Sequence, residues 1–282
     1  MPSVITEPAR HGLPSFVSSS GCFETMRAYG GVIFRLEEHL RRLQASATAF
    51  GVRLPSAGAQ LGRTLRHALK RAGIREAVVR IALVPAESGW RAGAPSIVVK
   101  AIEPPSAAQY RCGLKVAIVP TRKFEIGAID PQGKFSARLG SVMAVMEAQL
   151  RGVEEAIFLD TMTGSVTEST ASNLGVIING VLLSAPGWVG LLPGVTWQAL
   201  VEAAPALGLA VRERPLTRHD VYNADEVMLS STIKEVIAVT EVDGRRIGTG
   251  RPGPFTTRLH RAFRALVERE VKSQKAKGKR TR

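Results

Sequence analysis

A proline-rich stretch, Glu103-Pro-Pro-Ser-Ala-Ala-Gln109, divides this chain of 282 residues into two parts with different patterns. Because proline fixes φ and lacks a backbone N–H donor, adjacent prolines interrupt both helices and central strands. The stretch therefore predicts a small domain over residues 1–102, an interdomain linker over 103–113 and a larger domain over 114–270. An apolar content of 45% is enough to fill a real core.

The part before the linker combines strands and helices. Two strands are predicted to join at a hairpin formed by Gly30-Gly31. Apolar residues then recur at helical spacing over 37–50, with Arg42 about 120° from that stripe, and again over 61–72. This mixture of elements predicts an α+β domain.

A predicted strand over 77–84 contains an arginine in an otherwise apolar run. The period of two places Arg80 on the same face as small side chains such as Ala82. Burying a guanidinium without a partner is costly. Two interpretations remain at this point. In the first, the arginine is structural, either on an edge strand or in an internal salt bridge. In the second, the arginine faces a cavity and binds an anion there. A further strand is predicted over 96–102.

The part after the linker is rich in strands and hairpins. Asn179-Gly180 and Asp243-Gly244 mark hairpin turns, and the first pair supplies the two positive φ angles of a type I′ turn. A helix with an apolar face, formed by residues such as Leu139, Met143 and Met146, follows the turn at Gly133. The predicted elements are strands over 114–119, 155–160, 225–230 and 233–240, a hairpin over 176–183, and helices that begin near 139, 195 and 254.

The formal net charge of +14 raises the question of nucleic-acid binding. Part of the excess lies in a closing run of lysine and arginine over 271–282, which is predicted to be a disordered, basic tail. The remaining arginines are spread along predicted helices, without the cysteine–histidine spacing or basic–aromatic interleaving of a recognition module. Nucleic-acid binding as the main task is therefore a remote alternative.

Other classes lack their signals in this chain. No run of about 18 apolar residues is present, so no membrane span is predicted. The first residues lack the order of a secretory signal, and Cys22 and Cys112 predict neither a disulfide framework nor a metal site, which favours the cytoplasm. Walker-type loops, dinucleotide glycine fingerprints, paired histidine motifs and Gly-x-Ser-x-Gly are absent as well.

The groups that remain are those a phosphorylated aldehyde cofactor needs. Lys134 lies in a glycine-flanked turn, and Glu168 lies in the polar segment 165–173. An amine forms a Schiff base with an aldehyde, and a carboxylate holds a ring nitrogen protonated. Two turns, at 191–196 and 231–232, together with arginine, can offer backbone N–H groups, hydroxyls and charge to a phosphate.

Five stretches form a joint pattern that is highly specific, although each alone is not. They are Gly21-Cys-Phe-Glu-Thr-Met-Arg27, Glu38-His-Leu-Arg-Arg-Leu43 with Ser46-Ala47, Lys134 to Ala148, Glu154 to Asp160 with Val166 to Leu174, and Leu192-Pro-Gly-Val-Thr196. In this order they resemble the class IV family of pyridoxal-phosphate enzymes, which includes branched-chain aminotransferases, D-amino-acid aminotransferases and aminodeoxychorismate lyases. Further matches at 224–227, 231–232 and 242–256 extend the resemblance to roughly residues 21–267.

The resemblance implies a two-domain fold-type IV enzyme with pyridoxal 5'-phosphate as cofactor. A small N-terminal α/β domain would precede a larger, strand-rich, barrel-like domain, and the enzyme would be a homodimer. Lys134 is implied to form the Schiff base and to move the catalytic proton, and Glu168 to meet the pyridine nitrogen. The implied phosphate-binding residues are Arg42, Val195, Thr196, Ser231 and Thr232, and the implied substrate-binding residues are Phe23, Arg27, Arg80, Arg91 and Ile233.

The resemblance leaves the subgroup open. We expect an aminotransferase that transfers the amino group of an aliphatic or branched-chain amino acid to 2-oxoglutarate. Arg138 and Phe23-Glu-Thr25 favour aminodeoxychorismate lyase, which forms 4-aminobenzoate and pyruvate. The runs Val242-Asp-Gly-Arg245 and Gly253-Pro254 favour an aminotransferase. A D-amino-acid aminotransferase is the weaker alternative.

Overall fold

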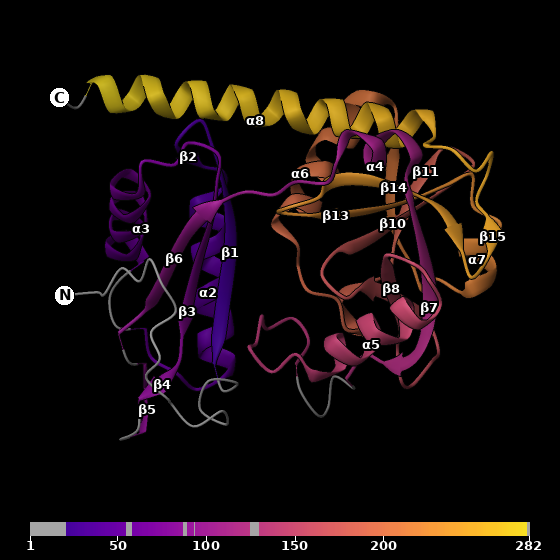
Figure 1. Cartoon of the computed structure of the whole chain (residues 1–282), viewed down its shortest axis with the longest axis horizontal. Coiled ribbons are helices and arrows are strands. Elements are labelled where there is room, and N and C mark those ends of the chain that lie inside the picture. The colour runs from indigo at the N-terminus through magenta and orange to yellow at the C-terminus, as the bar shows by residue number, and fades with distance from the viewer. Residues whose placement is uncertain (1–20, 55–57, 87–88, 93, 125–129, 281–282) are drawn as a thin grey trace. The chain divides into compact units, whose positions relative to one another are not determined.

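The computed structural model describes residues 21–280, apart from 55–57, 87–88, 93 and 125–129 (Figure 1). The chain divides into two compact units, which we name the smaller unit and the larger unit. The smaller unit comprises Met1–Glu103, Gly133–Arg138 and Leu266–Arg282, and the larger unit comprises Pro104–Gln132 and Leu139–Ala265. Among the helices of the described residues, none is both long and apolar enough to cross a membrane.

The smaller unit combines antiparallel strands with two helices. Its elements are β1 (Cys22–Tyr29), β2 (Val32–Ile33), α2 (Leu36–Ala49), α3 (Gly58–Ala72), β3 (Ala77–Leu83), β4 (Pro85–Ala86), β5 (Gly89–Ala92) and β6 (Ser96–Ala101). The main sheet has the order β2-β1-β3-β6, and β4 pairs with β5. The predicted hairpin joins β1 to β2, where Gly30 and Gly31 have φ of 58° and 85°.

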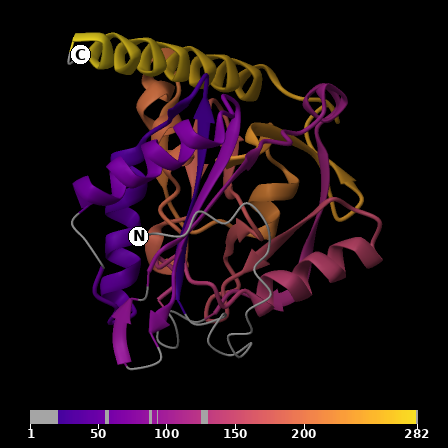
Figure 2. The same ribbon diagram turned by 60° about the vertical axis from the view of Figure 1, so that its left-hand side comes forward.

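Helices α2 and α3 cover one face of this sheet (Figure 2). The period of two in the strands turns Met26 and Ile81 toward the helices, where both are buried with Leu43 of α2. Fully burying such a side chain contributes about 1.5–3 kcal/mol, so this contact surface stabilises the unit. The alternate positions, including Arg80, lie on the opposite face.

The segment 133–138 belongs to the smaller unit, although the position of the linker predicts it in the larger domain. Strand β2 pairs only with the last two residues of β1, so the edge of β1 is open at its other end. There the Phe23 N–H donates to the Lys134 carbonyl at 3.0 Å, and the Ser136 N–H donates to the Gly21 carbonyl at 2.8 Å. The backbone groups of an open strand edge need partners, and this distant segment supplies them.

The larger unit contains one nine-stranded sheet and the helices around it. Its elements are α4 (Ala107–Cys112), β7 (Leu114–Arg122), α5 (Leu139–Leu150), β8 (Glu155–Leu159), β9 (Val166–Ser169), β10 (Asn173–Ile178), β11 (Val181–Ser184), α6 (Val195–Ala203), β12 (Ala210–Glu213), α7 (Arg218–Tyr222), β13 (Glu226–Ser231), β14 (Glu235–Val242), β15 (Arg245–Arg246) and the start of α8 (Pro254–Arg280). The strand order is β12-β11-β10-β13-β14-β7-β8-β9, and β15 pairs with β14.

This sheet curls toward a barrel. Its terminal strands are β12 and β9, and one isolated antiparallel bridge joins Val166 of β9 to Leu216, which follows β12. The Val166 N–H donates to the Leu216 carbonyl at 2.7 Å. A buried apolar core that includes Leu114, Ile157 and Leu229 fills the unit. The unit therefore has the strand-rich, barrel-like character that the resemblance implies.

Both predicted hairpin turns of the larger unit are present. Asn179 and Gly180 have φ of 50° and 72° between β10 and β11, and Asp243 and Gly244 have φ of 51° and 75° between β14 and β15. These residues adopt the left-handed region at low cost, so they set the register of each hairpin.

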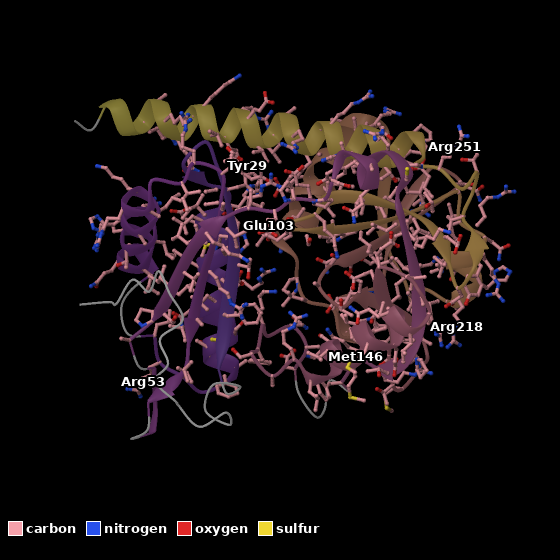
Figure 3. The ribbon with its side chains drawn as sticks, in the orientation of Figure 1. Tyr29, Arg53, Glu103, Met146, Arg218 and Arg251 are labelled. Carbon is pink, nitrogen blue, oxygen red and sulfur yellow. The ribbon has the colours of Figure 1, made fainter. Side chains whose placement is uncertain are left out.

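Helix α5 buries its small side chains and exposes its large ones. It packs on β7 and β8, and its buried residues are Ala144 and Ala148. Met146, labelled in Figure 3, lies on the predicted apolar face, which is open to solvent in the single chain. The exposed residues of this face, with exposed fractions between 48% and 88%, are Leu139, Val142, Met143, Met146 and Leu150.

Two segments differ from the prediction. The predicted linker over 103–113 contains α4, whose N-cap Ser106 exchanges hydrogen bonds with Gln109 in a capping box. The tail predicted to be disordered over 271–282 instead continues α8 as far as Arg280. Lysine, alanine and glutamine are strong helix formers, so the helix propagates once its buried earlier turns have formed.

Candidate active site

Lys134 lies against the open end of β1 in the smaller unit. Its backbone N–H donates to Ser46 Oγ at 2.9 Å, and its carbonyl accepts from the Phe23 N–H. Its Nζ lies 4.9 Å from the centroid of the Phe23 ring, within range of a cation–π interaction. Because the backbone is bonded on both sides, the amine is presented by an anchored segment even though Gly133 precedes it.

A buried carboxylate holds Arg42 on the inner face of α2. Arg42 Nε and Nη2 donate to Glu24 Oε1 and Oε2 at 2.6 and 2.8 Å, and His39 Nδ1 lies 2.8 Å from Oε2. Glu24 is completely buried, and the Arg42 side chain is 9% exposed. The spacing of His39, Arg42 and Ser46 places them on one side of the helix. The pair with Glu24 fixes the guanidinium plane through its Nε–Nη2 edge, and Nη1 is not part of that pair.

Burial and pairing set the charges of this cluster. Burial alone would raise the pKa of Glu24, but the hydrogen bonds and charge of Arg42, with those of His39, hold it at about 2. Burial lowers the pKa of His39, although Glu24 acts in the opposite direction. The ring is therefore neutral at pH 7, and its Nδ1–H donates to Glu24. The charges of Arg42 and Lys134 lower the pKa of His39 as well.

Arg80 and Lys134 both approach the ring of Phe23. Arg80 Cζ lies 4.1 Å from the ring centroid, and Arg80 pairs with Thr25 in the β1–β3 register. Burial and the nearby Arg138 guanidinium lower the pKa of Arg80. The edge-strand interpretation of Arg80 is wrong, because β3 lies between β1 and β6. Two cations against one aromatic ring, with the charge of Arg138 acting on one of them, make this region suited to an anionic substrate.

The remaining predicted substrate residues occupy different places. Arg27 is buried in β1, with its Cζ 4.4 Å from the Tyr29 ring centroid, and it shares the strand face of Phe23. Arg91 lies in β5, and its side chain lies outside the described part of the structure. Ile233 lies in the larger unit, in the turn that follows β13.

Glu168 is the central buried carboxylate of the larger unit, with an exposed fraction of 6%. Lys123 Nζ donates to its Oε1, while the Leu192 N–H and the Asn173 amide donate to its Oε2 at 3.2 and 3.4 Å. Asn173 Nδ2 also donates to the Leu192 carbonyl at 2.8 Å. All of these partners are donors, so the carboxylate acts as an acceptor toward each of them, and it can accept the N–H of a protonated ring in the same way.

The start of α6 lies beside these groups. Its N-cap is Gly194, and a Cβ at that position would collide with the Asn173 side chain, so the close approach requires glycine. Among the described residues no side chain caps this end of the helix, so its first N–H groups, at Val195 and Thr196, can bind an acceptor that is not part of the helix. Helix N-termini of this kind bind phosphate.

The turn formed by Ser231, Thr232 and Ile233 lies near the same asparagine. In the β10–β13 register Asn173 pairs with Ser230, the residue before this turn. The register thus brings the predicted phosphate-binding turn close to the Glu168 cluster, although no short sequence motif connects them.

Two buried glutamates anchor the end of this turn. Lys234 Nζ donates to Glu155, and Glu235 accepts from His260 Nε2 at 2.8 Å and from Arg264 Nε at 2.5 Å. Glu235 itself has a φ of 54°, so a charged network stabilises a backbone conformation that non-glycine residues rarely adopt.

Buried hydroxyls near these groups allow a test of the fit to a cofactor. Within the part of the chain that the structure describes, the hydroxyls of Ser169, Ser172 and Ser230 are buried without a hydrogen-bond partner. Buried polar atoms are normally bonded, so such atoms indicate a place for a polar ligand. A carboxylate for a ring nitrogen beside N–H and hydroxyl groups for a phosphate fits a phosphorylated pyridine.

The structure gathers the predicted residues in two groups. Sequence reasoning gave no role to Glu24, His39, Lys123 or Asn173. Glu24, His39 and Asn173 lie within the matching stretches, whereas Lys123 has no local signal. The smaller unit holds Lys134, Arg42, Phe23, Arg27, Arg80 and Arg91, and the larger unit holds Glu168, Val195, Thr196, Ser231, Thr232 and Ile233.

Known proteins share both the sequence pattern and the fold. A family model described as Amino-transferase class IV matches residues 21–242. The putative branched-chain-amino-acid aminotransferase of Methanocaldococcus jannaschii is 33% identical over 262 residues, which cover 91% of this chain and 89% of that protein. The D-alanine aminotransferase of Bacillus licheniformis is 30% identical over 269 residues, which cover 89% of each. The solved T.th. branched-chain amino acid aminotransferase, complexed with N-(5'-phosphopyridoxyl)-L-glutamate, has a TM-score of 0.86 and 27% identity and covers 94% of this chain and 91% of its own.

Proposed function

Because the chain belongs to the class IV aminotransferase family, we propose that it transfers the amino group of a branched-chain or other aliphatic L-amino acid to 2-oxoglutarate. The predicted family, fold class and enzyme class are confirmed by the match over residues 21–242 and by the likeness to solved structures. The chain is an enzyme that depends on pyridoxal 5'-phosphate, as the sequence predicts.

Lys134 and Glu168 carry the chemistry in this proposal. When bound, pyridoxal phosphate supplies an aldehyde for the amino group and a ring that withdraws electrons from the substrate α-carbon. Lys134 Nζ would hold the cofactor through that aldehyde. Once the substrate amino group has displaced it, the freed amine would move the proton of the substrate α-carbon. Glu168 would accept the N–H of the ring nitrogen and so favour the protonated form of that nitrogen. The backbone bonds of Lys134 and the three donors around Glu168 support these roles.

Phosphate binding falls to Arg42 and to two turns. The Arg42 guanidinium is fixed by Glu24 before any ligand arrives, which lowers the entropy that binding would otherwise cost. The N–H groups of Val195 and Thr196 and the groups of Ser231 and Thr232 complete the set.

Substrate recognition falls to the region around Phe23. Its ring offers an apolar contact for a branched side chain, while Arg80 supplies a positive charge for the second carboxylate of 2-oxoglutarate or glutamate. We assign Arg27, Arg91 and Ile233 to the remaining substrate contacts.

The observation that carries this proposal is the grouping of Glu168 with the uncapped start of α6 and with three unsatisfied hydroxyls. The test is an assay panel on the protein loaded with pyridoxal phosphate. We expect glutamate-dependent transamination of the oxo acids of leucine and isoleucine. Pyruvate release from aminodeoxychorismate, without transamination, would contradict the proposal in favour of the lyase.

A second candidate is a D-amino-acid aminotransferase, favoured by the 30% identity to the Bacillus licheniformis D-alanine aminotransferase. The two candidates differ in which face of the substrate α-carbon exchanges its proton. Incubation of the loaded protein with L-leucine and with D-alanine, in separate reactions, distinguishes them by which amino acid is converted to its oxo acid.

We further propose that the enzyme is a homodimer that covers the exposed face of α5. This face presents large apolar side chains such as Met143 and Met146. The charged residue of the helix, Glu147, accepts hydrogen bonds from Thr121. Apolar patches of this kind usually mark interfaces. Met146→Glu should turn a dimer into a monomer in analytical ultracentrifugation, and an unchanged mass would contradict the assignment.

We also assign the enzyme to the reducing cytoplasm, because Cys22 and Cys112 are both free thiols. Cell fractionation of the native host tests this assignment. Recovery of the protein with secreted proteins would overturn it.

A further inference from the structure

Lys123 lies immediately after β7 and donates its Nζ to Glu168, 45 positions later in the chain. We propose that Lys123 is a positioning residue that keeps Glu168 ionised and fixed for the ring nitrogen of the cofactor. The inference rests on the proposed role of Glu168. It adds a residue that neither the sequence motifs nor the comparisons assign.

The backbone of Lys123 is itself held in place. Its N–H donates to the Leu159 carbonyl at 3.0 Å, and its carbonyl accepts from Thr161 Oγ1 at 2.7 Å. Its Nζ also lies 5.7 Å from the centroid of the Phe158 ring. The side chain is 20% exposed, so the lysine reaches Glu168 from a partly buried position with little freedom to move. A residue held this firmly can fix the carboxylate that it contacts.

The other partners of Glu168 are neutral. The Leu192 N–H and the Asn173 amide donate at 3.2 and 3.4 Å, and the second of these bonds is long for a hydrogen bond. Of the partners that the structure describes for this carboxylate, Lys123 alone carries a charge. A buried carboxylate without a nearby cation is costly and takes up a proton more readily. Lys123 therefore determines whether Glu168 can act as an acceptor.

An ordinary structural salt bridge is the competing explanation. Such a bridge would stabilise the larger unit without influencing the ring nitrogen. The chain offers a control in β7, the strand that precedes Lys123, because Lys115 forms an exposed pair with Glu241 at 3.1 Å. The variants Lys123→Met, Lys123→Arg and Lys115→Met separate charge from side-chain bulk and from the general loss of a salt bridge.

The first measurement is the affinity of the full-length protein for pyridoxal phosphate, followed by fluorescence quenching at pH 8 and pH 6. We expect Lys123→Met to bind about tenfold more weakly at pH 8, with a larger deficit at pH 6. Lys123→Arg should stay within about threefold of the parent, because it retains the charge, and Lys115→Met should match the parent. An unchanged affinity in Lys123→Met would overturn the inference.

The second measurement separates positioning from a structural role. A phosphorylated benzaldehyde analogue has no ring nitrogen, so its affinity should change little in Lys123→Met. Equal losses for both ligands would show a purely structural effect. Adding Lys123→Met to Glu168→Gln should cause no further loss of pyridoxal phosphate affinity, and an additional loss would show that Lys123 acts independently of Glu168.

Infrared spectroscopy tests the charge state without any cofactor. At pH 6 Lys123→Met should show a protonated-carboxyl band that disappears when Glu168→Gln is added, and Lys123→Arg should lack the band. Absence of the band in Lys123→Met overturns the inference about ionisation. If the parent protein instead fails to bind pyridoxal phosphate at all, the proposed function fails, while the infrared result still decides the role of Lys123.

Discussion

Glu24 in the smaller unit and Glu168 in the larger unit are both buried glutamates that pair with a cation. In the proposed reaction, however, the cation acts in one pair and the carboxylate acts in the other. In the first pair the working group is the cation, Arg42, and the glutamate holds it in place. In the second pair the working group is the glutamate, and Lys123 supports it. The comparison teaches that an ion pair in a site cannot be interpreted from its geometry alone, since the surrounding groups decide which member acts.

The two carboxylates differ in how completely the residues around them satisfy the polar groups of the site. Glu24 is satisfied by Arg42 and by the ring of His39, so its carboxylate is saturated by charged and polar donors. Glu168 has neutral donors besides its lysine, and hydroxyls such as those of Ser169 and Ser172 lie nearby without partners among the described residues. The first environment is closed around its carboxylate, and the second has polar atoms left for a ligand.

The largest expected effect lies outside both pairs, at Lys134. Lys134→Ala should reduce the rate of transamination by about 10⁴-fold or more, because it removes the amine that we propose carries the proton. The protein should also lack the long-wavelength absorption of the bound cofactor. Lys115→Ala, on the same chain but in an exposed ion pair, serves as the control. A Lys134→Ala variant that keeps full activity would contradict the proposed reaction, on which the roles of Glu24 and Glu168 depend.

The next effect separates the two glutamates by kinetics. Glu168→Gln should lower kcat by about 10²- to 10³-fold in steady-state assays, because the neutral amide no longer keeps the ring nitrogen protonated. Glu24→Gln should act on the affinity for pyridoxal phosphate and leave kcat at saturating cofactor within about threefold of the parent. If Glu24→Gln lowers kcat as strongly as Glu168→Gln does, the division of roles is wrong.

Glu24→Gln, which should affect kcat little, should have a clear effect on stability. Glu24→Gln leaves the buried Arg42 guanidinium without its counter-charge and should lower the free energy of unfolding by about 3 kcal/mol. Urea denaturation measures this change. Glu37→Gln is the matched control on α2, since Glu37 pairs with Arg66 at an exposed site, and it should cost less than about 1 kcal/mol. Equal costs for the two variants would contradict the buried-pair argument.

The smallest expected effect is a dependence of stability on pH that comes from the first pair. The folded pKa of His39 lies below its ordinary value of 6.5, so below that pH the unfolded chain binds a proton that the folded chain does not. Stability should therefore fall by roughly 1 kcal/mol between pH 7 and pH 5. Glu24 adds a further loss as the pH falls from 4.5 toward its folded pKa of about 2.

The pH dependence is measured by urea denaturation at pH 7, 6 and 5, in the parent and in His39→Gln. The variant should show a shallower decline between pH 7 and pH 5, because glutamine does not titrate. An identical slope in both proteins would assign the decline to other groups.

Local signals in the sequence predict the elements that depend on local physics. The turns at Asn179-Gly180 and Asp243-Gly244 follow from residues that accept positive φ, and the helix over 37–50 follows from its apolar spacing. The prolines beside Ser106 predict a plain linker, whereas the structure forms a capping box between Ser106 and Gln109 and a short helix after it. The helical continuation to Arg280 shows that composition alone did not establish disorder.

The remaining features depend on contacts between distant segments. The periodicity of α5 predicts an apolar face but cannot say whether the same chain covers it, and Met146 is in fact exposed. The attachment of 133–138 to β1 depends on which strand edge stays open. Lys123 reaches Glu168 across 45 positions, and no spacing rule connects two residues so far apart. The resemblance predicts which residues act in the reaction, while the structure shows which residues contact them.

The most direct test of the account is to identify the lysine that holds the cofactor. The protein is incubated with pyridoxal phosphate, the resulting imine is reduced with borohydride, and the modified peptide is mapped by mass spectrometry. We predict a single stoichiometric adduct on Lys134. An adduct on Lys123 with Lys134 unmodified, or no adduct on either lysine, would contradict the central claim.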